Sequence, residues 1–159
     1  MTEIRAVRED DWRVLRDIRL EALRESPAAF GSSYAREAVF TEADWRRRAS
    51  GHGFFAYLPD LGDLPVGLAG GIDEGTGTAQ LVSMWVRPQV RGRKAGAALV
   101  MAMVDWARGR GLSHLNLWVT DGNQAARALY ERCGFTPTGE RQPLPSGPAH
   151  TEIGMMLSL

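Results

Sequence analysis

Four basic residues lie close together in a stretch of the chain that has no acidic residue. From Gly75 to Val104 there is no Asp or Glu, while Arg87, Arg91, Arg93 and the only lysine, Lys94, add four positive charges. An apolar run typical of a strand precedes them, and a periodic run typical of a helix follows. The N-terminus of a helix has unpaired N–H groups and a partial positive charge, so this arrangement favours a bound phosphate or pyrophosphate. A plain turn with arginines on its surface is the alternative.

A second set of residues that could take part in catalysis or ligand binding follows the next predicted strand. The residues from Asn123 to Tyr130 repeat at helical spacing, and Gly134 is a suitable residue to end that helix. The Tyr130 hydroxyl could donate a proton, although its place on the apolar stripe is more typical of a core aromatic residue. Asn123 could bind a ligand or a water molecule, or it could cap the helix. Cys133 lies on the same stripe and is expected to be a small core residue.

The composition excludes several classes of protein. Lys plus Arg equals Asp plus Glu, 19 against 19, and this net charge of zero gives no support for a DNA-binding or polybasic membrane protein. The longest apolar run, Ala97 to Val104, is too short to span a bilayer, and the N-terminus has no apolar signal region. We therefore expect a cytoplasmic protein that binds neither nucleic acid nor membrane. One cysteine excludes an intramolecular disulfide, and three scattered histidines favour no metal site.

The apolar pattern predicts one domain over residues 1–159, in which strands and helices alternate. Strands are expected at 4–7, 53–58, 66–72, 79–86, 115–119, from 135 onward, and at 152–157. Helices are expected at 11–25, 41–49, 95–108 and 123–133, whereas 24–38 and the Pro-rich 137–148 are expected to be loops. A strand, a long helix and a strand in succession, as in 79–119, imply a parallel crossover, and the hairpins before it imply antiparallel pairs. The fold class is therefore α/β, with a mixed, mostly antiparallel sheet and helices on both faces.

Taken together, the two segments resemble the GCN5-related N-acetyltransferase (GNAT) superfamily. Its acetyl-coenzyme A signature, [QR]-x-x-G-x-[GA] after a strand that ends V-x-P, matches at Arg91 and Gly96. A later block of the form N-x-x-A-x-x-L-Y-x-x-x-G-F matches over residues 123–135. The expected order of elements is also similar to that fold, and residues 21–33 look like a bacterial branch of the superfamily. This chain departs from the signature at Lys94, which stands where the first Gly belongs.

The resemblance implies a site and a reaction. An acceptor amine would attack the thioester of acetyl-coenzyme A directly in a ternary complex, and Tyr130 would protonate the leaving thiolate. Asn123 would bind the pantetheine arm or a water molecule. Backbone groups of Met84, Trp85 and Val86 would bind the pantetheine arm like an added strand. The pyrophosphate would be held next to Arg91 by the N–H groups of Gly92, Arg93, Lys94, Ala95, Gly96 and Ala97. Because Lys94 is expected to have a helical φ, its N–H could still face the pyrophosphate while its ammonium group adds a charge contact.

The sequence identifies neither the general base nor the residues that line the acceptor site. Some members of the superfamily carry a Glu five residues before the Asn of the second block, but here that position is Trp118, so no general base is identified. The acids near the expected rim of the site are Glu37, Asp73, Glu74, Glu140 and Glu152, and a water relay is as plausible as any of them. Phe30, Tyr34, Trp45 and the loop 141–150 could line the acceptor site, although the aromatic residues could instead be core.

The resemblance implies that the acceptor is a primary amine of a small molecule or of a peptide N-terminus. The sequence does not name this acceptor, because its contacts come from the variable loops. A sensor module that binds acyl-coenzyme A without turnover and a subunit that depends on a partner are the rival functions. A homodimer is left open.

Overall fold

A seven-stranded sheet organises the chain, whose residues 1–159 are all described by a computed structural model. The strands lie in the order β1-β2-β3-β4-β5-β7-β6, and β4 and β5 form the one parallel pair. This arrangement confirms the predicted mixed, mostly antiparallel sheet. The strands are β1 Glu3–Ala6, β2 His52–Tyr57, β3 Gly67–Asp73, β4 Thr78–Val86, β5 His114–Thr120, β6 Thr136–Leu144 and β7 Gly147–Ser158.

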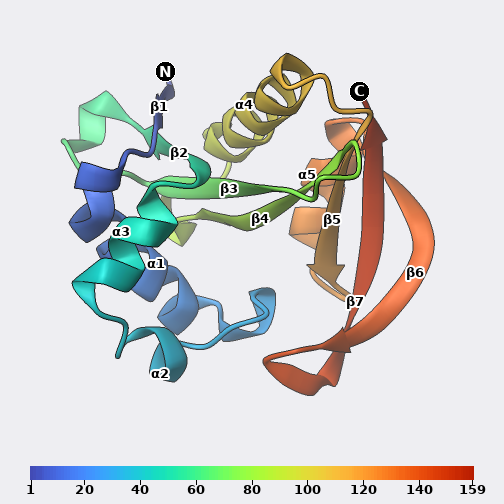
Figure 1. Ribbon diagram of the computed structural model, residues 1–159, viewed down its shortest axis with the longest axis horizontal. Coiled ribbons are helices and arrows are strands. Elements are labelled where there is room, and N and C mark those ends of the chain that lie inside the picture. Colours follow the sequence, from blue (N-terminus) through green and yellow to red (C-terminus); the bar gives the residue numbers. More distant parts are fainter.

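Helices cover both faces of the sheet, as predicted. In Figure 1, α1 and α3 lie on one side of β3 and β4, and α4 lies on the other side. The helices are α1 Trp12–Glu25, α2 Tyr34–Glu37, α3 Glu42–Ala49, α4 Ala95–Gly109 and α5 Gln124–Arg132. One buried apolar cluster joins the sheet to α1 and α3, and a larger one joins it to α4 and α5. None of these helices has the length and apolar character needed to cross a bilayer.

A β-bulge interrupts β4 in the middle of the sheet. Leu68 of β3 is opposite Trp85, but Gly70 is opposite Val82, so β4 contains one residue more than β3 over this interval. Ser83 lies at the bulge with φ 57°, in the left-handed region that non-glycine residues rarely adopt. An extra residue in a strand reverses which side chains point to each face.

The apolar side chains of β4 follow that reversal. Ala79 and Leu81 point toward α4 before the bulge, whereas Met84 and Val86 point toward it afterwards. Trp85 is consequently turned to the opposite face, where it is 4% exposed in the cluster under α1. The bulge therefore keeps both ends of β4 packed although the pattern of side chains shifts by one residue.

An ion pair is buried between α1 and α2. The Nε and Nη2 atoms of Arg19 each lie 3.0 Å from a carboxylate oxygen of Glu37, and Arg48 Nη1 lies 2.6 Å from Glu37 Oε1. The Glu37 side chain is fully buried. Burial by itself would raise the pKa of this carboxyl group, but the hydrogen bonds and charge of Arg19, together with Arg48, lower it to about 2. The third guanidinium nitrogen of Arg19 donates to Ser83 Oγ at 3.3 Å, which ties this buried pair to the bulge.

Two segments differ from the prediction of loops. Residues 137–148 form most of β6 and the start of β7, so the chain makes a hairpin with its turn at Pro145–Ser146. Proline is tolerated in β6 because this strand is at the edge of the sheet, where half of the backbone groups have no strand partner. Within 24–38 the chain forms a short 3-10 helix at Pro27–Ala29 and then α2. The other predicted strands and helices are confirmed, with small shifts of their ends.

We predict that Glu37→Gln destabilises the fold by about 3 kcal/mol at neutral pH, because it leaves the buried Arg19 without a counter-charge. Since the folded pKa of Glu37 is below its ordinary value of 4.5, its contribution is complete above about pH 4.5 and is lost as pH falls toward 2. Urea unfolding of both proteins from pH 7 to pH 2.5 measures this difference. Glu42→Gln, which breaks an exposed pair with Arg46, is the matched control. A difference between wild type and Glu37→Gln that stays constant over this range would contradict the assignment.

Candidate active site

The edges of β4 and β5 separate beyond the first residues that they share. Thr78–Leu81 pairs with His114–Leu117, and the strands then diverge, as Figure 1 shows by the steep angle between them. Arg87 N–H donates to Val66 O of the segment before β3 at 2.7 Å. Because alternate residues of a strand direct their backbone groups to opposite sides, Trp85 faces β3, whereas Met84 and Val86 face the open side. These last residues form an unpaired β4 edge.

A turn rich in free N–H groups follows the unpaired β4 edge. Pro88–Val90 forms a 3-10 segment, and α4 begins at Ala95. Five backbone N–H groups near this point donate no hydrogen bond within the protein: those of Gly92, Lys94, Ala95, Gly96 and Ala97. The N–H of Arg93 is already used, since it donates to Val90 O at 3.3 Å. Unpaired donors at the start of a helix of this length, with its partial positive charge, form a site suited to an anion.

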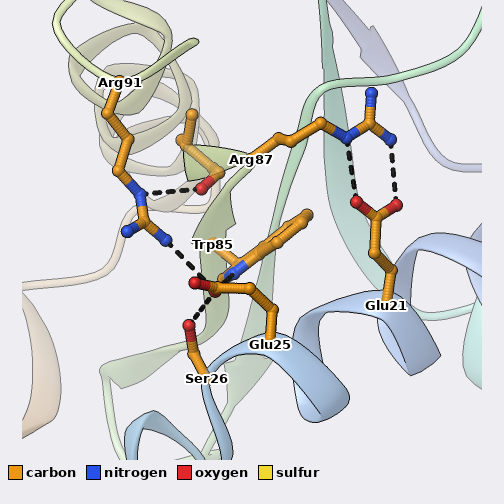
Figure 2. A network of polar contacts seen from close by, with 7 residues as sticks. Glu21, Glu25, Ser26, Trp85, Arg87 and Arg91 are labelled. Carbon is orange, nitrogen blue, oxygen red and sulfur yellow. Dashed lines mark hydrogen bonds and ion pairs between the residues drawn. The ribbon is translucent and has the colours of Figure 1, made fainter. Parts of the chain in front are cut away.

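Three of the four basic side chains near this turn are engaged by carboxylates. Figure 2 shows Glu21 and Glu25 on successive turns of α1, facing the end of β4. Glu21 accepts two hydrogen bonds from Arg87, both at 2.9 Å. Glu25 accepts from Trp85 Nε1 at 3.0 Å and more weakly from Arg91, at 3.5 Å.

The remaining arginine of the turn is also paired. Arg93 lies 3.0 Å from Asp60 of the 3-10 segment between β2 and β3. Arg91 uses its Nε atom to donate to Val86 O at 2.9 Å, so its guanidinium group folds back on the strand end. Lys94 forms no ion pair. The positive charges of the three arginines are therefore balanced by carboxylates that are distant in the sequence but in contact in the fold. Lys94 is the exception.

Lys94 does not have the helical φ that we expected from the sequence. It is the N-cap of α4, with φ 68° and ψ 10°, in the left-handed region. A side chain in this conformation costs about 1–2 kcal/mol relative to glycine, because Cβ comes close to the following carbonyl group. The conformation explains why the signature has Gly at this position.

Gly96 allows α4, α5 and β4 to meet. A Cβ atom at Gly96 would lie 3.1 Å from Leu129 Cδ2 and 3.5 Å from Met84 Cε. The first of these contacts is tighter than ordinary van der Waals packing, so a larger residue would push α5 away from the N-terminus of α4. Gly96 therefore has a packing role in addition to its free N–H group, and it brings α5 next to the unpaired β4 edge.

Tyr130 follows Leu129 on α5 and has a buried ring. It is 6% exposed, and its ring meets Phe135 edge-on with centroids 5.9 Å apart. Burial raises the pKa of the Tyr130 phenol well above its ordinary value of 10. The hydroxyl is therefore a proton donor at neutral pH and cannot act there as a base.

Asn123 caps α5. Its Oδ1 atom accepts from Ala126 N–H at 3.3 Å, which is the capping alternative of the sequence analysis. This bond uses the oxygen of the amide and leaves both hydrogens of its NH2 group available for a ligand. Cys133 is half-buried at the end of the same helix, and burial raises the pKa of its thiol, in agreement with a core residue.

A family comparison agrees with this geometry. The model described as the acetyltransferase (GNAT) family matches residues 12–135, which include α1, the unpaired β4 edge, the turn and α5. The chain belongs to the GNAT acetyltransferase family.

Individual relatives match smaller parts of the chain or only its fold. Mycothiol acetyltransferase from Beutenbergia cavernae is 39% identical over 41% of this chain and 27% of that protein. A probable N-acetyltransferase, family 8 member 5, from Mus musculus is 34% identical over 60% of this chain and 44% of that protein. The chain thus spans less than half the length of these curated relatives. A putative acetyltransferase from Salmonella typhimurium, solved with acetyl-CoA, has a TM-score of 0.80 over 100% of this chain and 94% of that chain, at 20% identity, and shares the GNAT fold.

Two of the five candidate acids lie in salt bridges that lower their basicity. Glu37 is the buried partner of Arg19 and, with a pKa of about 2, it is a poor base at neutral pH. Asp73 lies at the end of β3, where the Gly75 N–H and Arg110 lower the pKa of its carboxyl group. Both residues therefore form salt bridges within the fold, Glu37 with Arg19 and Arg48 and Asp73 with Arg110. Glu74 follows Asp73 in the exposed turn between β3 and β4.

The other two acids lie on the hairpin of β6 and β7. Glu140 is exposed on the edge strand, and Glu152 is 7% exposed, with Gln142 donating to its Oε1. Glu152 is opposite Thr120 at the end of β5. Trp118 stands on the same face of β5 as Thr120. It occupies the β5 position for which the resemblance implies Glu in some family members, and it has an indole in place of a carboxylate.

The aromatic residues proposed for the acceptor site are mostly core. Trp45 is 1% exposed and Phe30 5% exposed in the cluster under α1. Tyr34 is partly buried, and its hydroxyl accepts from Arg24. None of these three residues belongs to the turn or to the unpaired β4 edge. The rings of Phe30 and Trp45 instead lie under the guanidinium groups of Arg19 and Arg48.

Several residues that position the site without belonging to it were not predicted from the sequence. Glu21, Glu25 and Asp60 fix the arginines of the turn, and Ser83 forms the bulge. The bulge had a signal in the sequence, because polar and apolar residues alternate up to Leu81, and the continuous apolar run Met84–Val86 after Ser83 breaks this alternation. The acids had none, because each is separated from its arginine by more than thirty residues of sequence.

We predict that Lys94→Gly raises the free energy of unfolding by about 0.5 kcal/mol, because relief of the left-handed conformation exceeds the entropic cost of glycine. Gly92 has φ 91° with no heavy atom near an added Cβ, so Gly92→Ala introduces the same strain without a steric clash. This variant should lose about 1 kcal/mol. Urea unfolding of the two variants and the wild type measures both changes. A destabilised Lys94→Gly would show that the Lys94 side chain makes a contact that outweighs its strain.

Proposed function

We propose that this chain is an N-acetyltransferase that moves an acetyl group from acetyl-coenzyme A to a primary amine. The observation that carries the proposal is the unpaired β4 edge leading directly into five free N–H groups at the start of α4. A pantetheine arm contains amides that pair with a strand edge, and a pyrophosphate is the anion that follows it in coenzyme A. The two parts of the site therefore match the two parts of one ligand in the correct order.

Each part of the site has a role in this proposal. Met84 and Val86 offer backbone groups to the pantetheine arm, although Val86 O is shared with Arg91. The prediction that the Trp85 backbone pairs with the pantetheine arm is wrong, because this residue faces β3, and its indole is buried under α1 with Nε1 donating to Glu25. The N–H groups from Gly92 to Ala97, with that of Arg93 excepted, bind the pyrophosphate. The Asn123 NH2 group is available to the pantetheine arm or to a water molecule.

The reaction is a direct transfer in a ternary complex. The neutral amine nitrogen attacks the carbonyl carbon of the thioester, the C–N bond forms, and the C–S bond breaks. The thiolate takes a proton from Tyr130 Oη, and the amine nitrogen loses its proton to water. The Tyr130 phenolate then takes a proton from water, which restores the phenol for the next turnover. Because the pKa of the Tyr130 phenol is raised, the donor is protonated but weakly acidic, so its contribution depends on its position next to the leaving sulfur.

The names of the relatives support an amine acceptor without selecting one. They include a probable N-acetyltransferase, family 8 member 5, from Mus musculus and, among solved structures, a ribosomal-protein-alanine N-acetyltransferase from Brucella melitensis. Thiol release from acetyl-coenzyme A over a panel of peptides, polyamines, aminoglycosides and amino acids tests the proposal. A chain that binds acetyl-coenzyme A but transfers no acetyl group to any of them would be a sensor module instead.

We predict that Tyr130→Phe lowers turnover about 100-fold and leaves the affinity for coenzyme A nearly unchanged, because the ring is kept and the proton is lost. Thiol release with the best amine of the panel, and calorimetric titration with coenzyme A, measure the two quantities. Phe135→Leu, which alters the same aromatic contact without removing a hydroxyl group, is the control for packing. Turnover within a few-fold of wild type would assign Tyr130 to the core alone.

We also predict that Lys94→Glu weakens coenzyme A binding more than tenfold at low salt, because it puts a negative charge in place of the only unpaired cation of the turn. The same titration in 0.5 M salt should show a much smaller difference, since an exposed charge is screened over a few ångströms there. Lys94→Gly should lose only a few-fold at low salt. Equal affinities of wild type and Lys94→Glu at low salt would mean that the ammonium group points away from the phosphates.

A further inference from the structure

A cavity of about 400 Å³ lies between α1 and α3 on one side and β2, β3 and β4 on the other. Its walls are partly apolar, with Leu15, Leu68 and Val82 among them. A volume of this size is in the range of small-molecule sites. The cavity reaches Ser83, the bulge residue directly before Met84, so it borders the start of the unpaired β4 edge.

The charges that line this cavity all have one sign. The ionisable residues of its lining are Arg19, Arg47, Arg48 and His52, and no carboxylate is among them. Glu37 lies behind the lining and is fully buried. One carboxylate therefore compensates two guanidinium groups, those of Arg19 and Arg48.

The three arginines differ in how much hydrogen-bonding capacity they retain. Arg19 uses all three of its guanidinium nitrogens, two of them to bind Glu37 and the third to bind Ser83. Arg48 uses only Nη1 for Glu37, and its side chain is 38% exposed. Arg47 uses only Nη1, in an exposed contact with Asp44 at 3.2 Å. Free N–H groups of Arg47 and Arg48 are thus available to an anion that enters the cavity.

We infer that the acceptor of this acetyltransferase is a small amine that also carries a carboxylate or phosphate group, which Arg47 and Arg48 bind in this cavity. The inference rests on the proposed function, because it takes the amine to meet the thioester beside Ser83 and Met84. A purely cationic amine, such as a polyamine, would meet an uncompensated positive charge in the same place. The apolar walls suit the carbon chain that separates the amine from the anionic group.

Matched amines that differ only in the anionic group test this inference. The pairs are 4-aminobutanoate with 4-aminobutanamide, and phosphoethanolamine with ethanolamine. For the wild type, we expect kcat/KM to be at least tenfold higher for at least one anionic member than for its partner. Equal values within every pair, with activity present, would overturn the inference and leave the proposed function standing.

Variants place the effect at this cavity. Arg47→Gln should raise KM for the anionic amine by about 3- to 10-fold, and Arg47→Glu should raise it further, while kcat/KM for the partner that lacks the anionic group changes little. Arg13→Gln, on α1 over the Trp12 ring and outside the cavity lining, is the matched control and should behave as wild type. Thermal unfolding of each variant verifies that the fold is kept. An anionic preference that survives Arg47→Glu would also overturn the inference.

A binding measurement separates this inference from the proposed function. If no amine is acetylated, calorimetric titration of wild type and Arg47→Glu with phosphoethanolamine and 4-aminobutanoate decides the matter directly. Binding that is lost in Arg47→Glu and kept in Arg13→Gln supports the anionic site although the acetyl transfer fails. No binding to the wild type overturns the site as well.

Discussion

The bulge at Ser83 is the constraint on which the candidate site depends. A strand that continued without an extra residue would keep the parity of Ala79 and Leu81, and it would direct Trp85 rather than Met84 and Val86 toward α4. The bulge also coincides with the point where β4 and β5 cease to pair, so backbone groups that a sheet normally satisfies are left for a ligand. The left-handed conformation of Ser83 is held by its hydrogen bond from Arg19, which is itself fixed by the buried Glu37. A buried ion pair between helices thereby supports the shape of the strand.

The balance of charge in this chain is local as well as global. Arg87 and Arg91 form ion pairs with two carboxylates of α1, and Arg93 forms one with Asp60 in the segment before β3. These pairs connect the end of β4 and the following turn to both segments. Exposed pairs of this kind contribute little stability individually, but together they restrict where the turn can lie. An anion bound at the start of α4 would then be held chiefly by backbone N–H groups that are already oriented. Lys94 is the one basic side chain of the turn without a carboxylate partner, and it has a strained backbone conformation.

Most of the elements were predictable because their apolar patterns are regular. The stripe of α4 and the capping box of Thr41 and Asp44 give clear local signals, and both are present in the structure. The hairpin of β6 and β7 was predicted as a loop because Pro and Gly in 137–148 outweighed a strand pattern, although an edge strand accepts both. The predicted helical φ of Lys94 was wrong, because the residue type alone favours a helical backbone. Only the geometry of the turn imposes the left-handed conformation. The partners of the arginines depend on the tertiary fold, which no local pattern encodes.

The proton that the acceptor amine must lose has no carboxylate base assigned on β4 or β5, and the cationic cavity offers a physical reason why none is required there. A positively charged environment disfavours an ammonium ion and lowers its pKa, in the same way that a like charge lowers the pKa of a buried lysine. Arg47 and Arg48, compensated only in part by Asp44 and Glu37, would act on a bound amine in this direction. An anionic group on the acceptor would then bind the arginines, and the more of their charge it neutralises, the smaller this effect on the amine becomes. A bound anion that lies between the arginines and the amine opposes their effect on the amine pKa, because a nearby negative charge favours the ammonium form. This opposition weakens with distance, which favours acceptors whose amine and anion are separated by several bonds.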